Sequence, residues 1–87
     1  MPPRVRLTNE ETERLPSLLS LIDGRRHEFP GDAHPSVQAH WIADRYADES
    51  PLTINLITLL LFEHGVHRSV NQVSQDLAIL PEDTDHE

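Results

Sequence analysis

Apolar residues recur at helical spacing in the first third of this 87-residue chain. Four of them share one helical face at positions i, i+3, i+4 and i+7: Leu15, Leu18, Leu19 and Ile22. Thr8 followed by Glu11 has the sequence of an N-terminal capping box, and Gly24 is a residue type that commonly follows a helix end. The pattern predicts a helix over 8–23, which Pro16 either kinks or restarts because proline has no backbone N–H.

The next apolar pattern begins at Pro35, after a predicted loop over 25–34 that contains a Pro-Gly turn signal. Proline is favoured in the first turn of a helix, so we expect a second helix over 35–47. Its apolar residues cover two faces: Val37, Ala39, Trp41, Ile42, Ala43 and Tyr46. A helix with two apolar faces is expected to pack on more than one neighbour.

A third helix is predicted over 51–64 by signals at both of its ends. Ser50 suits the N-cap, Pro51 suits the first helical position, and Gly65 suits the position after the last turn. Several β-branched residues make a strand over 52–58 the competing interpretation.

The predicted third helix is almost wholly apolar: Leu52, Ile54, Leu56, Ile57, Leu59, Leu60, Leu61 and Phe62. Projected on a helical wheel, these residues leave only a narrow gap around Asn55 and Thr58. A helix that is apolar all round is buried all round, so we expect it at the centre of the fold.

Ser69 and Gln72 form a second capping-box sequence and predict a fourth helix over 69–78. Its expected inner stripe is Val70, Val73 and Leu77, and its expected outer face is Asn71, Gln72, Ser74 and Gln75. The chain is thus predicted to be all-α: a compact bundle of about four helices in one domain over 1–80. Residues 1–7 are expected to form an extended arm, and residues 81–87 an acidic disordered tail.

The composition of the chain mainly excludes classes of protein, namely secreted and membrane-spanning ones. The chain has no cysteine and no apolar h-region near its start, and its longest apolar block is about half a membrane span. We therefore expect a cytoplasmic protein without membrane contact. The formal net charge is −8, and all of the acidic excess follows residue 31. Such a charge repels phosphate backbones and suits a basic partner, or it serves solubility.

The residues offer little for catalysis or ligand binding. There is no cysteine nucleophile, neither Ser36 nor Ser69 lies in a nucleophile elbow, and the three glycines form no phosphate loop. His64 and His67 have a spacing seen in metal sites, but they straddle Gly65 and lack a third ligand motif. His64 instead suits the C-terminal end of a helix, where a partly cationic imidazole is favourable. We expect no enzyme, no cofactor, no metal and no small-molecule substrate.

Residues 57–65 and 69–77 loosely resemble half of a winged-helix or helix-turn-helix unit, with Gly65 in the turn. The resemblance implies a DNA-binding role for Arg68, at a phosphate, and for three residues that can read adenine edges: Asn71, Gln72 and Gln75. However, Pro81 and an acidic stretch stand where a further recognition helix would follow, and Arg68 is the one basic side chain of the segment apart from histidine. DNA binding is therefore the alternative interpretation.

The preferred interpretation is a protein–protein interaction module, either a homodimer or a small bacterial or phage regulatory or inhibitory protein that docks on another protein. The third helix has more apolar surface than three short neighbours are expected to cover. Aromatic residues and arginine are favoured at interface hot spots, although Trp41 could equally fill the core. The expected contact residues are Trp41, Arg45 and Tyr46 on the second helix, and Asn55, Thr58 and Phe62 on the third.

Overall fold

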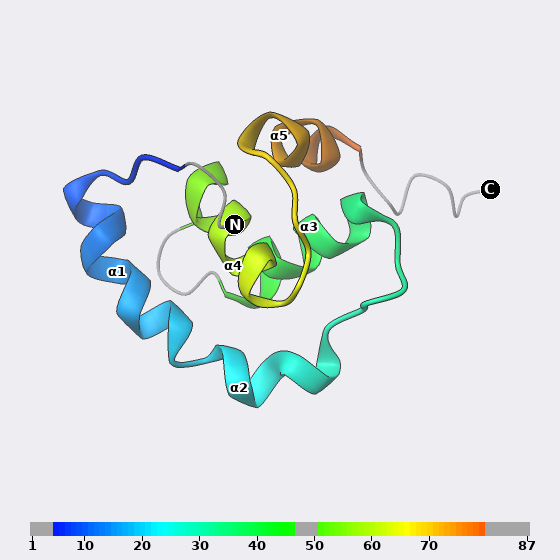
Figure 1. The fold of residues 1–87 in the computed structure, drawn as a ribbon, viewed down its shortest axis with the longest axis horizontal. Coiled ribbons are helices and arrows are strands. Elements are labelled where there is room, and N and C mark those ends of the chain that lie inside the picture. The colour runs from blue at the N-terminus through cyan, green and yellow to red at the C-terminus, as the bar shows by residue number, and fades with distance from the viewer. Residues whose placement is uncertain (1–4, 47–50, 80–87) are drawn as a thin grey trace.

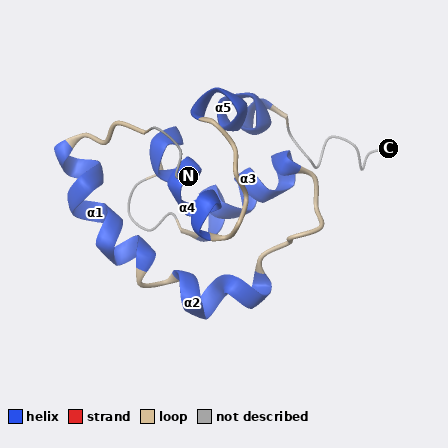
Figure 2. Ribbon diagram, in the orientation of Figure 1, coloured by secondary structure: helices blue, strands red, loops and turns tan. Residues whose placement is uncertain are grey.

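The computed structural model describes residues 5–46 and 51–79. Its helical segments are α1 (Asn9–Leu19), α2 (Ile22–Arg25), the 3₁₀ helix η1 (Arg26–Glu28), α3 (Pro35–Arg45), α4 (Ile54–Glu63) and α5 (Val70–Ala78). Figure 2 shows helices and loops, with no strand in the described part of the chain, so the all-α prediction is confirmed and the strand over 52–58 is excluded.

The helices are arranged as a group of three with a curved segment beside it. Helices α3, α4 and α5 all contact one another, and α1 packs against α4 (Figure 1). The chain from α1 through η1 curves around one side of this group. The Cα radius of gyration is 12.6 Å. A folded domain of this length is expected to have a radius of about 12 Å, so the structure is compact.

The N-terminal region differs from the single helix predicted over 8–23. Helix α1 runs through Pro16 without restarting there, and the break comes at Ser20 and Leu21. The prediction that Gly24 ends a helix is wrong, because Gly24 lies inside α2. A glycine ends a helix when it adopts positive φ, and among the described residues only Gly65 does so.

Arginine side chains hold the α2–η1 segment against the ends of two other helices. Arg25 donates from Nη1 to the carbonyl of Arg45, the last residue of α3. Arg26 donates from Nη1 to the carbonyl of Glu63, the last residue of α4, at 3.0 Å. Helix C-termini carry unsatisfied carbonyls and a partial negative charge, so both guanidinium groups stabilise the ends they contact. The chain therefore continues as η1 where a free loop was expected.

Helix α1 begins with the predicted capping box, and this box also reaches α4. The amide of Glu11 donates to Thr8 Oγ1 at 3.1 Å, and the amide of Thr8 donates to Glu11 Oε1 at 2.8 Å. The other carboxylate oxygen of Glu11 accepts from the hydroxyl of Thr53, which is the N-cap residue of α4. One buried carboxylate thus lies at the N-termini of two helices, where negative charge is favourable.

Glu11→Gln is expected to lower the free energy of unfolding at neutral pH by about 1 kcal/mol, because it removes a charge-assisted contact to two caps. The hydrogen bond from Thr53, followed by that from the Thr8 amide, holds the pKa of Glu11 below its ordinary value of 4.5. The stabilisation is therefore fully present above pH 4.5 and is lost as pH falls through the folded-state pKa.

Urea denaturation of wild type and Glu11→Gln at neutral and acidic pH tests this prediction. The difference in stability should shrink in acid, when the wild-type carboxyl is protonated. Glu10→Gln is the matched control, since Glu10 lies in the same first turn but is exposed. An equal loss in both variants would show that the contact with Thr53 contributes nothing.

Helix α4 begins three residues later than predicted. Thr53 is its N-cap and accepts a hydrogen bond from the amide of Leu56 at 3.3 Å, so Pro51 precedes the helix. Ser50, the predicted cap, lies outside the described residues. Thr53 is also held by a tertiary contact, because its hydroxyl donates to the carboxylate of Glu11.

The predicted end of α4 at Gly65 is confirmed. Gly65 has a φ of 92°, and its amide donates to the carbonyl of Phe62 at 2.9 Å. The amide of Val66 donates to the carbonyl of Leu61 at 2.8 Å. These two bonds form a Schellman motif, in which the left-handed residue is normally glycine because a Cβ atom disfavours that conformation.

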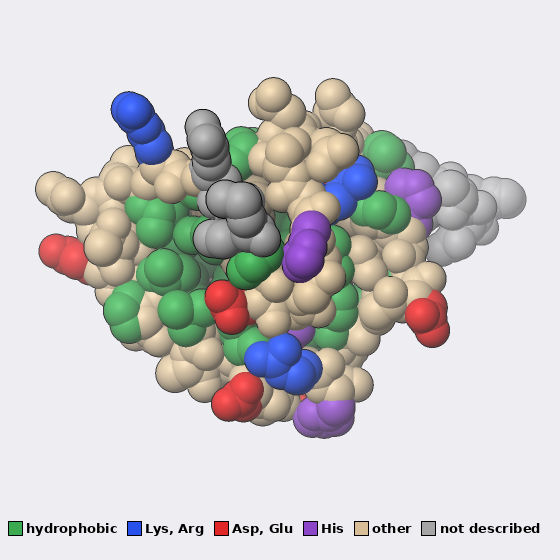
Figure 3. All heavy atoms as spheres, in the orientation of Figure 1, with side chains coloured by type: hydrophobic (Ala, Val, Ile, Leu, Met, Phe, Trp, Pro, Cys, Tyr) green, Lys and Arg blue, Asp and Glu red, His purple; other side chains and the backbone are tan. Residues whose placement is uncertain are grey.

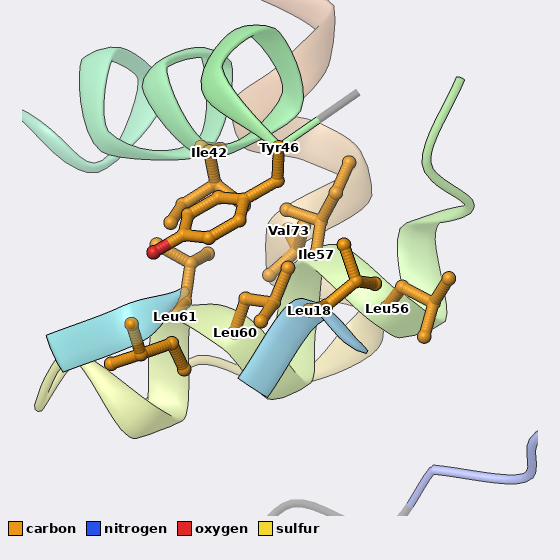
Figure 4. Close-up of a cluster of buried hydrophobic side chains, with 10 residues drawn as sticks. Leu18, Ile42, Tyr46, Leu56, Ile57, Leu60, Leu61 and Val73 are labelled. Atoms are coloured by element: carbon orange, nitrogen blue, oxygen red, sulfur yellow. The ribbon is translucent and has the colours of Figure 1, made fainter. Parts of the chain in front are cut away.

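The core is built from all five α-helices and the residue that follows α3. Its buried apolar residues are Leu18, Ile22, Ala39, Ile42, Tyr46, Leu56, Ile57, Leu60, Leu61 and Val73. Figure 4 shows Ile42 and Tyr46 pointing from the α3 side toward Leu60 and Leu61 of α4. Helix α3 ends at Arg45, slightly before the predicted end at Ala47, which lies outside the described residues, as do residues 81–87.

Candidate docking surface and aromatic cluster

Four rings gather where α3 and α4 end, and we call them the aromatic cluster: Phe29, Trp41, Tyr46 and His64. The imidazole of His64 stacks on Phe29, with ring centroids 4.5 Å apart and an interplanar angle of 12°. Trp41 stands edge-on to both rings, 5.4 Å from Phe29 and 5.8 Å from His64. The hydroxyl of Tyr46 lies 3.0 Å from Nε2 of His64. The cluster joins the η1 end to both helices.

The structure brings the predicted contact residues of the second helix together but turns two of them inward. Tyr46 is only 1% exposed, so it cannot meet a partner while the domain is folded, and that assignment is corrected. Trp41 is partly buried and packs against the core, which favours the core role that its sequence left open. Arg45 is exposed, lies 5.4 Å above the Trp41 ring, and contacts Glu28 at 3.4 Å.

His64 does not act as the cationic end of a helix, as its position in the sequence suggested. Burial lowers the pKa of His64 from its ordinary value, and the nearby guanidinium of Arg26 lowers it further, so the neutral form is favoured. Arg26 itself supplies the positive charge at the end of α4. His67 stacks instead on Phe62, 4.9 Å away, and no three potential ligands gather to hold a metal ion within the described ranges.

The three predicted contact residues of α4 have different environments. Thr58 is 0% exposed and donates its hydroxyl to the carbonyl of Ile54, so the assignment of Thr58 to a partner contact is wrong. Asn55 is partly buried and donates from Nδ2 to the carbonyl of Arg6 at 2.9 Å. Asn55 therefore anchors the described part of the N-terminal arm. Phe62 is partly exposed, beside His67.

Two of the residues assigned to DNA binding, Arg68 and Gln72, form hydrogen bonds within the chain. Arg68 forms two hydrogen bonds with Asp76, from Nε to Oδ2 at 3.0 Å and from Nη2 to Oδ1 at 2.9 Å. Gln72 completes the predicted capping box, because its Oε1 accepts from the amide of Ser69 at 2.9 Å. Asn71 and Gln75 are exposed on the outer face of α5, as predicted. The proposed phosphate contact of Arg68 is thus replaced by an internal ion pair.

Asp76 is the residue that sequence reasoning missed. It belongs to the acidic excess that follows residue 31, yet it is only 4% exposed. A signal was present in the sequence, because Asp76 follows Val73 by three positions and precedes Leu77, so it shares the inner face of α5. A buried carboxylate on such a face requires a partner, and Arg68 is the nearest arginine in the sequence.

Among the residues that the structure describes, the large apolar ones most exposed are Leu19, Ile54 and Ile79, with 38%, 37% and 48% of their surface accessible. Leu19 lies one turn after the partly buried Leu15 on α1, while Ile54 and the partly buried Leu52 flank Thr53, which Glu11 of α1 contacts. We call this set the α1 apolar surface: Leu15, Leu19, Leu52 and Ile54. Figure 3 shows hydrophobic side chains gathered over α1, at the left of the view.

None of the helices in the described ranges is long and apolar enough to cross a membrane. No protein-family model matches the chain, and neither a curated protein nor a solved structure does.

Proposed function

We propose that the protein is a non-catalytic protein–protein interaction module, a small regulatory or inhibitory protein of a bacterium or phage that acts by docking or by dimerisation. The observation that supports it most is the α1 apolar surface, on which Leu19 and Ile54 each expose more than a third of their area. Removing apolar surface from water contributes about 25 cal/mol per Å², which makes such a surface favourable for association.

The position of this surface differs from the one expected at the sequence level. Helix α4 contacts α1, α3 and α5, and Leu56, Ile57, Leu60 and Leu61 are buried between them. Its apolar residues are therefore largely covered within one chain and do not require a second one. Helix α1, in contrast, packs chiefly on α4, so one of its sides is left for a partner.

The polar residues around α1 also fit an interface. Glu10 and Glu13 are exposed on this helix, and Arg14 lies next to Leu15 and contacts the carbonyl of Pro51 at 3.1 Å. Protein interfaces commonly have an apolar centre and a charged rim. The net charge of −8 favours a partner whose own rim is basic.

DNA binding through the α4–α5 pair has less support. Affinity for DNA comes largely from basic side chains at phosphates, and Arg68 is engaged by Asp76. Two exposed amides remain, at Asn71 and Gln75. Replacing both by alanine should leave any functional association unchanged, whereas a salt-dependent loss of DNA affinity in this variant would favour the alternative.

Leu19→Glu is expected to weaken association at least tenfold, which corresponds to about 1.4 kcal/mol, because it places a charge within the apolar contact. Light scattering of the purified protein over a hundredfold dilution measures self-association, and capture from a host lysate measures docking on another protein. Ile79→Glu is the matched control, since Ile79 is the most exposed of the three residues but lies at the end of α5.

The two forms of the proposal give different results. A homodimer should dissociate on dilution, and Leu19→Glu should shift that dissociation to higher concentration. A wild type that stays monomeric but captures a partner that Leu19→Glu does not capture would identify docking on another protein. Equal behaviour of wild type, Leu19→Glu and Ile79→Glu in both measurements would contradict the proposal.

A further inference from the structure

The imidazole of His64 has one hydrogen-bond partner, and its surroundings disfavour the positively charged, protonated form. Its Nε2 contacts the hydroxyl of Tyr46, while its Nδ1 is buried and contacts no hydrogen-bonding atom of the described residues. A neutral imidazole carries one donor and one acceptor, whereas the imidazolium carries two donors. In either tautomer of the neutral ring, protonation gives an imidazolium whose N–H at the buried Nδ1 has no acceptor among the described residues.

The charged groups around this ring also oppose protonation. From the α2–η1 segment, Arg25 lies 5.0 Å above the Tyr46 ring, and Arg26 binds the carbonyl of Glu63 directly before His64. From α3, Arg45 lies above Trp41.

Two carboxylates belong to the same region of the fold: Glu28 pairs with Arg45 and His27, and Glu63 is exposed. Neither carboxylate forms an ion pair with His64 in the described structure.

The ring is also a mechanical link between segments that are distant in the sequence. Phe29 follows η1 and lies flat on the imidazole at 4.5 Å, while Tyr46 and Trp41 belong to the α3 side of the cluster. We propose that neutral His64 locks residues 25–29 onto the ends of α3 and α4, and that its protonation in mildly acidic solution releases this segment. The lock is a pH-sensitive device independent of the proposed docking function.

The direction of the effect follows from the cause of the pKa shift. Burial, and then Arg26, lowers the pKa of His64 below its ordinary value of 6.5. The stability that the neutral ring contributes is therefore fully present above pH 6.5 and is lost as pH falls through the folded-state pKa. Stability should decline as the pH falls below 6.5.

The single tryptophan of the chain makes this testable, because Trp41 stands 5.8 Å from the ring of His64. Its fluorescence should change in one transition as the pH falls, with a midpoint below 6.5, the ordinary pKa of histidine. His64→Gln cannot become charged and should lose this transition. His67→Gln is the matched control, since His67 is exposed, lies three residues later in the chain and should leave the transition unchanged.

Hydrogen exchange measures the release itself. After correction for the intrinsic dependence on pH, peptides covering 25–29 should lose protection across the same transition in wild type and in His67→Gln, but not in His64→Gln. Because His64→Gln could fail to fold, the ring of His64 is also titrated directly by NMR in the wild type. Retention of the fluorescence transition in a folded His64→Gln would overturn the proposal. So would a His64 ring that titrates in the wild type at or above pH 6.5.

Discussion

Leu60→Ala is expected to lower the free energy of unfolding by about 3 kcal/mol, because the substitution leaves a cavity at a close-packed site. Leu60 is 0% exposed and belongs to the core shared by α3, α4 and α5. A domain of this length is stabilised by about 4–13 kcal/mol in total. The loss is therefore a large fraction of that stability and should lower the melting temperature by about 12–24 °C.

Leu59→Ala is the matched control, because it makes the same chemical change one position earlier on a partly exposed side chain. Its expected cost is about 1 kcal/mol, since less apolar surface returns to water. Thermal and urea unfolding of both variants, each at two protein concentrations, measures the difference. Equal losses would contradict the orientation of α4, and a cost that depends on concentration would indicate that Leu60 contributes to association.

Asp76→Ala is expected to cost about 3 kcal/mol, because it leaves the guanidinium of Arg68 without its partner. Both oxygens of Asp76 accept hydrogen bonds from Arg68, and the pair holds the loop before α5 onto the inner face of that helix. The side chain of Asp76 is 6% exposed and that of Arg68 is 29% exposed. Arg68→Ala should therefore cost a comparable amount, since it strands the more deeply buried charge.

A double-mutant cycle separates the pair from its surroundings. Replacing both residues, with Arg68→Ala and Asp76→Ala together, should cost less than the sum of the two single variants, because no unpaired charge remains. Glu63→Ala is the control for the loss of an exposed acid and should change stability by less than about 0.5 kcal/mol. Additive effects of the two single changes would show that the ion pair stabilises nothing.

Local signals predicted the helix ends that depend on neighbouring residues alone. The capping boxes at Thr8 and Ser69 and the glycine stop at Gly65 are all present. Each is closed by hydrogen bonds between residues a few positions apart, so composition and spacing suffice to identify it. The boundaries that were wrong, at Gly24 and at the start of α4, depend on Arg25, Arg26 and Glu11, which contact distant parts of the chain.

The candidate site was predicted less well than the fold, because exposure is a property of packing. Trp41, Arg45 and Tyr46 lie together, as expected for neighbours on a helix. Trp41 and Tyr46, however, pack with Phe29 and His64 in the aromatic cluster and are therefore covered within the chain. Thr58 is buried although it lies on the polar side of the predicted helical wheel, because neighbouring helices also cover that side of α4. Its hydroxyl donates to the carbonyl of Ile54 within the same helix. The residue types of Trp41, Arg45 and Tyr46 predicted an interface on the second helix. In the folded chain, exposed apolar area lies instead at Leu19 and Ile54.

Helical periodicity and capping act within a few residues, so the helical class, the approximate position of most helices and their capped ends follow from the sequence. Which apolar faces meet, and which distant charges pair, depends instead on how the helices pack. Glu11 contacts Thr53 across 42 positions of the chain, and Arg26 contacts the end of α4 across 37 positions. Such contacts are selected by the joint burial of several helices, and no local spacing encodes them.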